Sequence, residues 1–148
     1  MKTKKILLVE DSPDDQELIR MGFEESHIAN DLVIVGDGAQ ALDYLFGAGK
    51  YADRDVSDKP HIILLDLKLP KVNGLEVLER LRADPRTEFI PVIILTSSSE
   101  EEDILASYKL GANSYVRKPV DFNHFAEAIK RLGLYWLILN HKPPQNNE

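Results

Sequence analysis

The sequence contains no cysteine, which excludes disulfide bonds, thiol catalysis and cysteine-ligated metal sites. Long hydrophobic runs are also missing, and none approaches the roughly 18 apolar residues that a membrane-spanning helix needs. The apolar run that follows the basic N-terminus, residues 6–9, is too short for the core of a signal peptide. We therefore expect a cytoplasmic protein with no membrane partner.

Basic residues are in the minority. The chain has 18 Lys and Arg against 25 Asp and Glu, which gives a net charge of -7. An acidic surface repels the phosphates of nucleic acids, so we expect no nucleic-acid partner. The length of 148 residues and the hydrophobic fraction of 43% are typical of one globular domain.

Four short apolar runs predict buried strands, at residues 6–9, 32–35, 62–65 and 92–95, and a weaker fifth strand is predicted at 114–117. The first four runs do not alternate with polar residues, which is typical of strands that are covered on both faces. Such strands belong to parallel sheets with helices on either side.

Helix patterns fall between the predicted strands. Ser12 and Pro13 indicate the start of a first helix, and Asp37 and Gly47 the start and end of a second. Leucine or aromatic spacing predicts three more helices, around residues 75–81, 104–108 and 122–132, the last of them capped by Asp121. Alternating strands and helices imply right-handed crossovers, with the ligand site beyond the carboxyl ends of the strands.

Polar residues follow the strands at the points where they end: Glu10 and Asp11 after the first, Asp66 after the third, Thr96 after the fourth and Lys118 after the fifth. Parallel strands bring these ends to one edge of the sheet, so we expect the side chains to converge. An acid after a strand often serves only to cap the next helix, but Ser12 already offers that cap.

Clustered carboxylates repel one another, and a hard divalent cation such as Mg²⁺ relieves the repulsion. A lysine and a hydroxyl at the same edge suit a phosphoryl group, whose oxygens need positive charge and hydrogen-bond donors. A carboxylate can itself attack phosphorus. These residues predict an aspartyl-phosphate site that requires Mg²⁺, with Mn²⁺ able to substitute.

Four segments, LLVEDSPDD, ILLDLKLPKVNG, VIILTSS and GANSYVRKP, resemble the motif regions of response-regulator receiver domains. The resemblance runs over residues 4–131, which we predict to be the receiver domain. It implies a flavodoxin-like, doubly wound (βα)5 sandwich with strand order 2-1-3-4-5. Residues 132–148 would form a C-terminal extension of the fifth helix and a polar tail.

The resemblance also implies roles for individual residues. Asp66 would be the phosphoacceptor, Lys118 would contact the phosphoryl group, Thr96 would supply the switch hydroxyl, and Tyr115 would be the aromatic residue that swings inward on activation.

Metal binding is implied in the same way. Asp11 would bind the ion directly together with Asp66, Glu10 would act mostly through water, and the backbone carbonyl of Lys68 would be a further ligand. A cis peptide bond is expected between Lys118 and Pro119.

A narrower resemblance is carried by LGLYWLILN, ALDYLFGAGKY and DLKLPKVNGLEVL, which are similar to response regulators of bacterial, cyanobacterial-type phytochrome histidine kinases. It implies a sensor histidine kinase of the phytochrome type as partner, a homodimer, and no output domain. The protein would be a phosphorylation-dependent switch that signals by protein contact. It would assist its own Mg²⁺-dependent phosphorylation and dephosphorylation, and would not be a conventional enzyme.

The apolar C-terminal segment 132–139 exceeds what one helix face needs. One stripe can continue the core face of the fifth helix: Leu132, Trp136 and Leu139. The remaining apolar residues would point away from this core face and would have to be buried against another surface: Leu134, Tyr135, Leu137 and Ile138. The tail could fold back over its own domain, but we favour a second copy of the chain, hence a homodimer through helix five.

Two alternatives use related chemistry. A haloacid-dehalogenase-type phosphatase also forms an aspartyl phosphate, but it needs a second acid two residues after the nucleophile, where this chain has Lys68. A receiver-like scaffold that no longer accepts phosphate would leave the complete set of polar strand ends unexplained.

Overall fold

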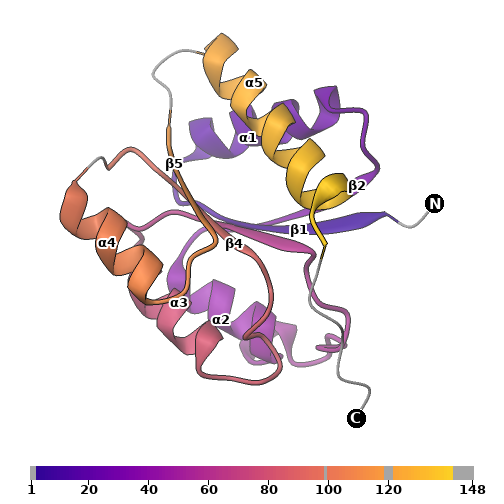
Figure 1. Ribbon diagram of the computed structural model, residues 1–148. Coiled ribbons are helices and arrows are strands. Elements are labelled where there is room, and N and C mark those ends of the chain that lie inside the picture. Colours follow the sequence, from indigo (N-terminus) through magenta and orange to yellow (C-terminus); the bar gives the residue numbers. More distant parts are fainter. Residues whose placement is uncertain (1–2, 99, 119–121, 142–148) are drawn as a thin grey trace.

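The computed structural model describes residues 3–98, 100–118 and 122–141, and it contains a five-stranded parallel sheet in the order β2-β1-β3-β4-β5 (Figure 1). The strands are β1 (Lys4–Val9), β2 (Asn30–Val35), β3 (Ile62–Leu65), β4 (Val92–Thr96) and β5 (Ser114–Arg117). All four pairings between neighbours are parallel. The predicted flavodoxin-like fold class and strand order are confirmed.

Helices cover both faces of the sheet. They are α1 (Pro13–Glu25), α2 (Gly38–Phe46), η1 (Gly49–Tyr51), α3 (Gly74–Arg82), α4 (Glu101–Lys109), α5 (Phe122–Gly133) and η2 (Leu134–Leu139). Figure 1 shows α1 and α5 together on one side of the strands, and α2, α3 and α4 on the other. No helix in the described part of the chain is long and apolar enough to cross a membrane. The cytoplasmic location stays a prediction.

Each face of the sheet has its own hydrophobic core. Residues of β1 alternate between the two: Leu7 and Val9 pack with α2 and α3, whereas Ile6 and Leu8 pack with α1 and α5. All four side chains are at most 1% exposed. This burial on both faces explains why the strand sequences are continuously apolar.

The predicted helix starts and stops are present where the structure describes them. The Ser12 hydroxyl accepts the Asp15 N–H at 3.3 Å, and the Asp37 carboxylate accepts the Gln40 N–H at 2.7 Å. Gly47 ends α2 with a φ of 68°, a conformation that favours glycine. The expected Asp121 cap, the cis bond before Pro119 and the polar tail lie outside the described residues.

Gly74 brings α3 close to the end of β3. A Cβ on Gly74 would lie 2.2 Å from the carbonyl oxygen of Asp66, and the Gly74 N–H donates to the Leu67 carbonyl at 2.9 Å. The backbone that carries Asp66 is therefore held against the first turn of α3, where only glycine fits.

The C-terminal segment corrects one predicted set of residues. Leu137, expected on a partner-facing surface, is 6% exposed and packs in the core with α1 and α5, whereas Leu139, expected in the core, is 61% exposed. The reason is the helix type, because η2 is a π-helix in which the Asn140 N–H donates to the carbonyl of Tyr135, five residues back. A π-helix needs more residues per turn than an α-helix, so the α-helical spacing assigned the wrong positions to the inner face.

The other three residues of that set are exposed as expected. Leu134, Tyr135 and Ile138 are each 50% exposed. Together with Leu139 they form an apolar surface on η2, which we call the η2 patch. On α4, Leu105 and Tyr108 are also exposed, by 57% and 49%, so these residues of the predicted fourth helix do not face the core.

Candidate functional site

Three carboxylates lie together at the carboxyl edge of the sheet. Glu10, Asp11 and Asp66 each offer one oxygen atom, and these oxygens all lie within 4.8 Å of one another. Glu10 is 1% exposed and Asp66 8%, whereas Asp11 is exposed. The cluster thus consists of two buried acids and one solvent-exposed acid, Asp11.

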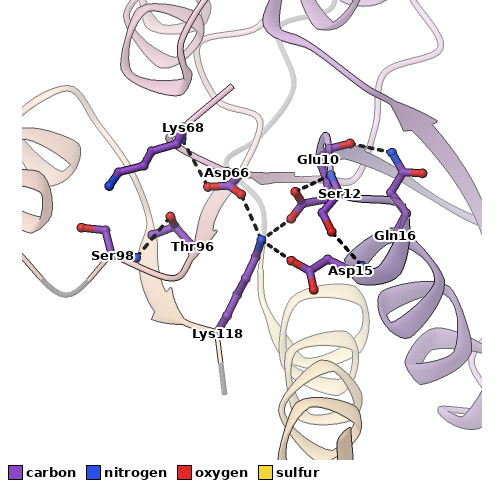
Figure 2. A network of polar contacts seen from close by, with 9 residues as sticks. All are labelled: Glu10, Ser12, Asp15, Gln16, Asp66, Lys68, Thr96, Ser98 and Lys118. Carbon is purple, nitrogen blue, oxygen red and sulfur yellow. Dashed lines mark hydrogen bonds and ion pairs between the residues drawn. The ribbon is translucent and has the colours of Figure 1, made fainter. Parts of the chain in front are cut away.

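The ammonium group of Lys118 sits among the acids. Its Nζ lies 2.9 Å from Asp66 Oδ2 and 2.8 Å from Asp15 Oδ2, and it also donates to Glu10 Oε1. Figure 2 shows the nitrogen at the centre of these three carboxylates. An ammonium has three N–H donors, so each donor has its own carboxylate partner.

The second oxygen of Asp66 has a backbone partner. The Lys68 N–H donates to Asp66 Oδ1 at 3.3 Å. The exposed Lys68 side chain points away from the acids in Figure 2. Asp66 is thus held between Lys118 on one oxygen and backbone on the other. The Lys68 carbonyl as a metal ligand stays a prediction.

Glu10 is fixed by the first turn of α1. Its Oε2 accepts the Ser12 N–H at 3.1 Å, and its backbone carbonyl accepts the Gln16 side-chain amide at 2.6 Å. Burial raises the pKa of Glu10 to about 7, although the Lys118 ammonium acts in the opposite direction. A nearby cation would favour the charged carboxylate.

Lys118 stays charged although its side chain is only 9% exposed. Burial alone would lower its pKa, but hydrogen bonds to the carboxylates of Asp15, Glu10 and Asp66 together raise it above the usual value. The site therefore offers a permanent positive charge next to Asp66.

The two predicted switch residues lie on β4 and β5. Thr96 is 1% exposed and its Oγ1 lies 3.5 Å from the Ser98 N–H. The Tyr115 hydroxyl donates to the Ser98 carbonyl at 2.9 Å, and burial raises the pKa of this phenol. Both residues thus meet the same short segment after β4. Their switch roles stay predictions.

The donor set fits a hard divalent cation. All the clustered side-chain donors are carboxylate oxygens, which Mg²⁺ and Mn²⁺ prefer, and the described residues contribute no nitrogen or sulfur ligand to the group. With Asp15 beside these three acids, four carboxylates share a single lysine, which leaves excess negative charge for a cation to balance.

The sequence did not reveal the part played by Asp15. We predicted it only as an acid in the first turn of a helix, where negative charge is favourable. In the structure its carboxylate reaches Lys118, which lies 103 positions further along the chain. The only signal was its position in the turn that directly follows the acidic pair.

Comparisons with known proteins agree on one family. The family model described as "Response regulator receiver domain" matches residues 6–130. The chain is 39% identical over 134 residues to response regulator Rcp1 of Synechocystis, with 90% of this chain and 89% of Rcp1 covered. The solved Mn²⁺-bound form of Rcp1 has a TM-score of 0.87 at 37% identity, covering 95% of this chain and 99% of that one.

Two further solved structures are similar. The phosphorylated cyanobacterial phytochrome response regulator RcpA has a TM-score of 0.90 at 38% identity, covering 97% of this chain and 100% of that one. The bacteriophytochrome response regulator RtBRR is 52% identical with a TM-score of 0.76, covering 97% of this chain and 86% of that one.

Proposed function

Since the chain belongs to the response regulator receiver domain family and is therefore a phosphorylation-dependent signalling module, we propose that Asp66 is the residue that accepts the phosphoryl group. The observation that carries the proposal is the position of this carboxylate. It is 8% exposed, lies beside two further acids, and has a lysine ammonium 2.9 Å from one oxygen. Asp15 and Asp37 also lie near strand ends, but neither belongs to the acidic group.

The proposed transfer starts from a phosphohistidine of a sensor histidine kinase. A carboxylate oxygen of Asp66 attacks phosphorus, so an O–P bond forms while the N–P bond breaks. The histidine nitrogen keeps the electron pair. Water later attacks phosphorus, which releases inorganic phosphate and restores the carboxylate.

The chain's own residues supply charge and hydrogen bonds. Lys118 would stabilise the negative oxygens of the phosphoryl group, because its ammonium already lies next to Asp66. The Thr96 hydroxyl would meet the same group after transfer. Glu10, Asp11, Asp66 and the Lys68 carbonyl would hold Mg²⁺ or Mn²⁺, which when bound neutralises charge on the phosphoryl oxygens.

The test is incubation with acetyl phosphate and Mg²⁺, followed by intact mass measurement. Wild type should gain one phosphoryl group, and Asp66→Asn should gain none. Asp37→Asn is the matched control, since Asp37 is also a buried acid beyond a strand end, and asparagine can still cap α2. A mass gain that persists in Asp66→Asn would refute the assignment.

The phosphoryl donor is proposed to be a phytochrome-type kinase. RcpA and RtBRR, which match nearly the whole chain, are named as phytochrome and bacteriophytochrome response regulators. Purified phytochrome kinase, phosphorylated on its histidine, should pass its label to this chain faster than an unrelated histidine kinase does. Equal rates from both kinases would remove the phytochrome part of the proposal.

A homodimer through the η2 patch is the proposed assembly. Leu134, Tyr135, Ile138 and Leu139 expose half or more of their surface on one short helix. A two-fold axis beside this helix would bury the same patch on both copies. We propose signalling by protein contact, with no binding to nucleic acid because the net charge is -7.

Family membership, the residue at position 68 and the mass measurement distinguish the proposed function from the two alternative functions. Family membership favours a receiver over a haloacid-dehalogenase-type phosphatase, and the position two residues after Asp66 carries an exposed lysine in place of the second carboxylic acid that such a phosphatase needs. A scaffold that accepts no phosphate predicts no mass gain in the wild type.

A further inference from the structure

The Asp15 carboxylate lies at the site but has no role in the phosphoryl transfer proposed above. It lies outside the group of three acids that fits a cation, yet its Oδ2 is 2.8 Å from Lys118 Nζ. Its side chain is 29% exposed, and that of Lys118 is 9% exposed. The contact is thus a mostly enclosed ion pair between the first turn of α1 and the end of β5.

The backbone around Asp15 is fixed to the acidic pair. The Asp15 N–H donates to the Ser12 hydroxyl at 3.3 Å, and the Ser12 N–H donates to Glu10 Oε2 at 3.1 Å. The next residue, Gln16, donates to the Glu10 carbonyl at 2.6 Å. Figure 2 shows this turn of α1 directly beside the lysine nitrogen. The Asp15 carboxylate therefore stands at a set place relative to the acids.

The three carboxylate partners of Lys118 would have different roles in the proposed reaction. Asp66 is the proposed acceptor, so its oxygen becomes bonded to phosphorus. Glu10 belongs to the acidic group that fits the cation. Neither can remain a constant partner of the ammonium, whereas Asp15 can. Without a constant partner, a lysine on a flexible four-carbon stem would regain rotamer freedom when its position matters most.

We propose that Asp15 is a positioning residue, which holds the Lys118 ammonium beside Asp66 while the phosphoryl group is transferred. This inference rests on the proposed function of Asp66 and adds a residue to the same site. Asp15 touches neither phosphorus nor its oxygens and acts through Lys118.

Two effects of Asp15 on the reaction oppose each other and can be separated. Its negative charge hinders the approach of an anionic donor, so removal of the charge should lower the half-saturating concentration of acetyl phosphate. Its hydrogen bond orients Lys118, so loss of the bond should lower the maximal rate of phosphorylation, by roughly tenfold or more. A residue with a purely structural role would not produce this split.

Asp14 provides the matched control. It is an exposed acid in the same helical turn, and among the described residues its side chain has no hydrogen-bond or ion-pair partner. Full-length wild type, Asp15→Ala, Asp15→Asn, Asp14→Ala and Asp14→Asn are phosphorylated with acetyl phosphate and Mg²⁺ and followed by intact mass. We expect a large fall in maximal rate for Asp15→Ala and a smaller one for Asp15→Asn, which keeps an acceptor oxygen. Both Asp14 variants should stay within about twofold of wild type, because they change charge without touching Lys118.

A second measurement requires no phosphorylation. In the metal-free protein, the ¹⁵N signal of the Lys118 ammonium should shift in Asp15→Ala and stay in place in Asp14→Ala. Equal maximal rates for Asp15→Ala and Asp14→Ala would overturn the inference, as would an unchanged ammonium signal. Failure of the wild type to gain mass would instead refute the proposed function, and the ammonium signal alone would then decide whether Asp15 positions Lys118.

Discussion

Gly74 and Asp66 are in backbone contact: a Cβ on Gly74 would lie 2.2 Å from the Asp66 carbonyl oxygen. Gly74→Ala must push the start of α3 away from the end of β3. We expect a loss of about 1–3 kcal/mol in the free energy of unfolding, together with slower phosphorylation. Urea unfolding and acetyl phosphate labelling measure the two effects. Gly36→Ala is the control, since a Cβ there has no atom within 4 Å. If both variants behave alike, the contact does not constrain the site.

Metal binding should stabilise the folded protein, because the ion binds the assembled acids and not the unfolded chain. At 100 times the dissociation constant the gain is about 2.7 kcal/mol. Thermal melts with and without Mg²⁺ measure it, and Asp66→Asn should show a smaller shift.

Removal of one acid from the cluster should stabilise the metal-free protein, although it weakens the stabilisation by Mg²⁺. Asp11→Asn relieves repulsion with Glu10 and Asp66, so the metal-free protein should melt higher, by roughly 2–5 °C, while its gain from Mg²⁺ shrinks. Asp14→Asn, which removes an equal charge outside the cluster, should not raise the melting temperature. A lower melting temperature for Asp11→Asn would show that the acids do not strain the metal-free state.

The proposed homodimer would depend on the η2 patch. The exposed halves of its four side chains would contribute roughly 0.75–1.5 kcal/mol each if buried, or about 6–12 kcal/mol over both copies, against an association cost of about 4–15 kcal/mol. At the favourable end of both ranges the net gain is about 8 kcal/mol, which corresponds to a micromolar dimer. We expect a dimer of this affinity, and we expect Ile138→Glu to dissociate it in sedimentation experiments. Leu105→Glu introduces the same charge at a similarly exposed site on α4 and should leave the dimer intact. A wild type that is monomeric at tens of micromolar would contradict the proposal.

Arg82 joins the end of α3 to the backbone around β4 and β5. Its guanidinium donates to the carbonyls of Glu88 and Ile90 at 2.8 Å each and to that of Gly111 at 2.9 Å. Arg82→Ala should cost about 3 kcal/mol of stability, since several carbonyls lose a charged donor. Arg80→Ala, on the exposed side of the same helix, should cost under about 1 kcal/mol in the same urea unfolding experiment.

Much of this architecture was predictable because buried parallel strands have an unmistakable sequence. The run 62–65 matches β3 to the residue, and Asp66 follows it directly. The carboxyl ends of parallel strands share one edge of the sheet, so the convergence of Glu10, Asp11, Asp66 and Lys118 could be predicted from the parallel arrangement of the strands.

The rest depended on three-dimensional packing that local patterns do not encode. The contact between Asp15 and Lys118 joins two segments that no periodicity relates. Leu105 resembles a core residue in the sequence but is 57% exposed, because α4 turns a small residue, Ser107, toward the sheet. Leu137 is buried and Leu139 exposed, the reverse of the prediction, because the segment forms a π-helix and not an α-helix.

That change of helix type makes the exposed face of η2 sensitive to chain length as well as to residue identity. Loss of a single residue between Gly133 and Leu137 would return the segment to an ordinary helical pitch and turn every later side chain about the axis. Ile138 would then take the inward place of Leu137, and a different set of side chains would face outward. Insertions and deletions of one residue in this segment are therefore a means by which related chains can change which apolar side chains they expose without altering the acidic site at the far end of the strands.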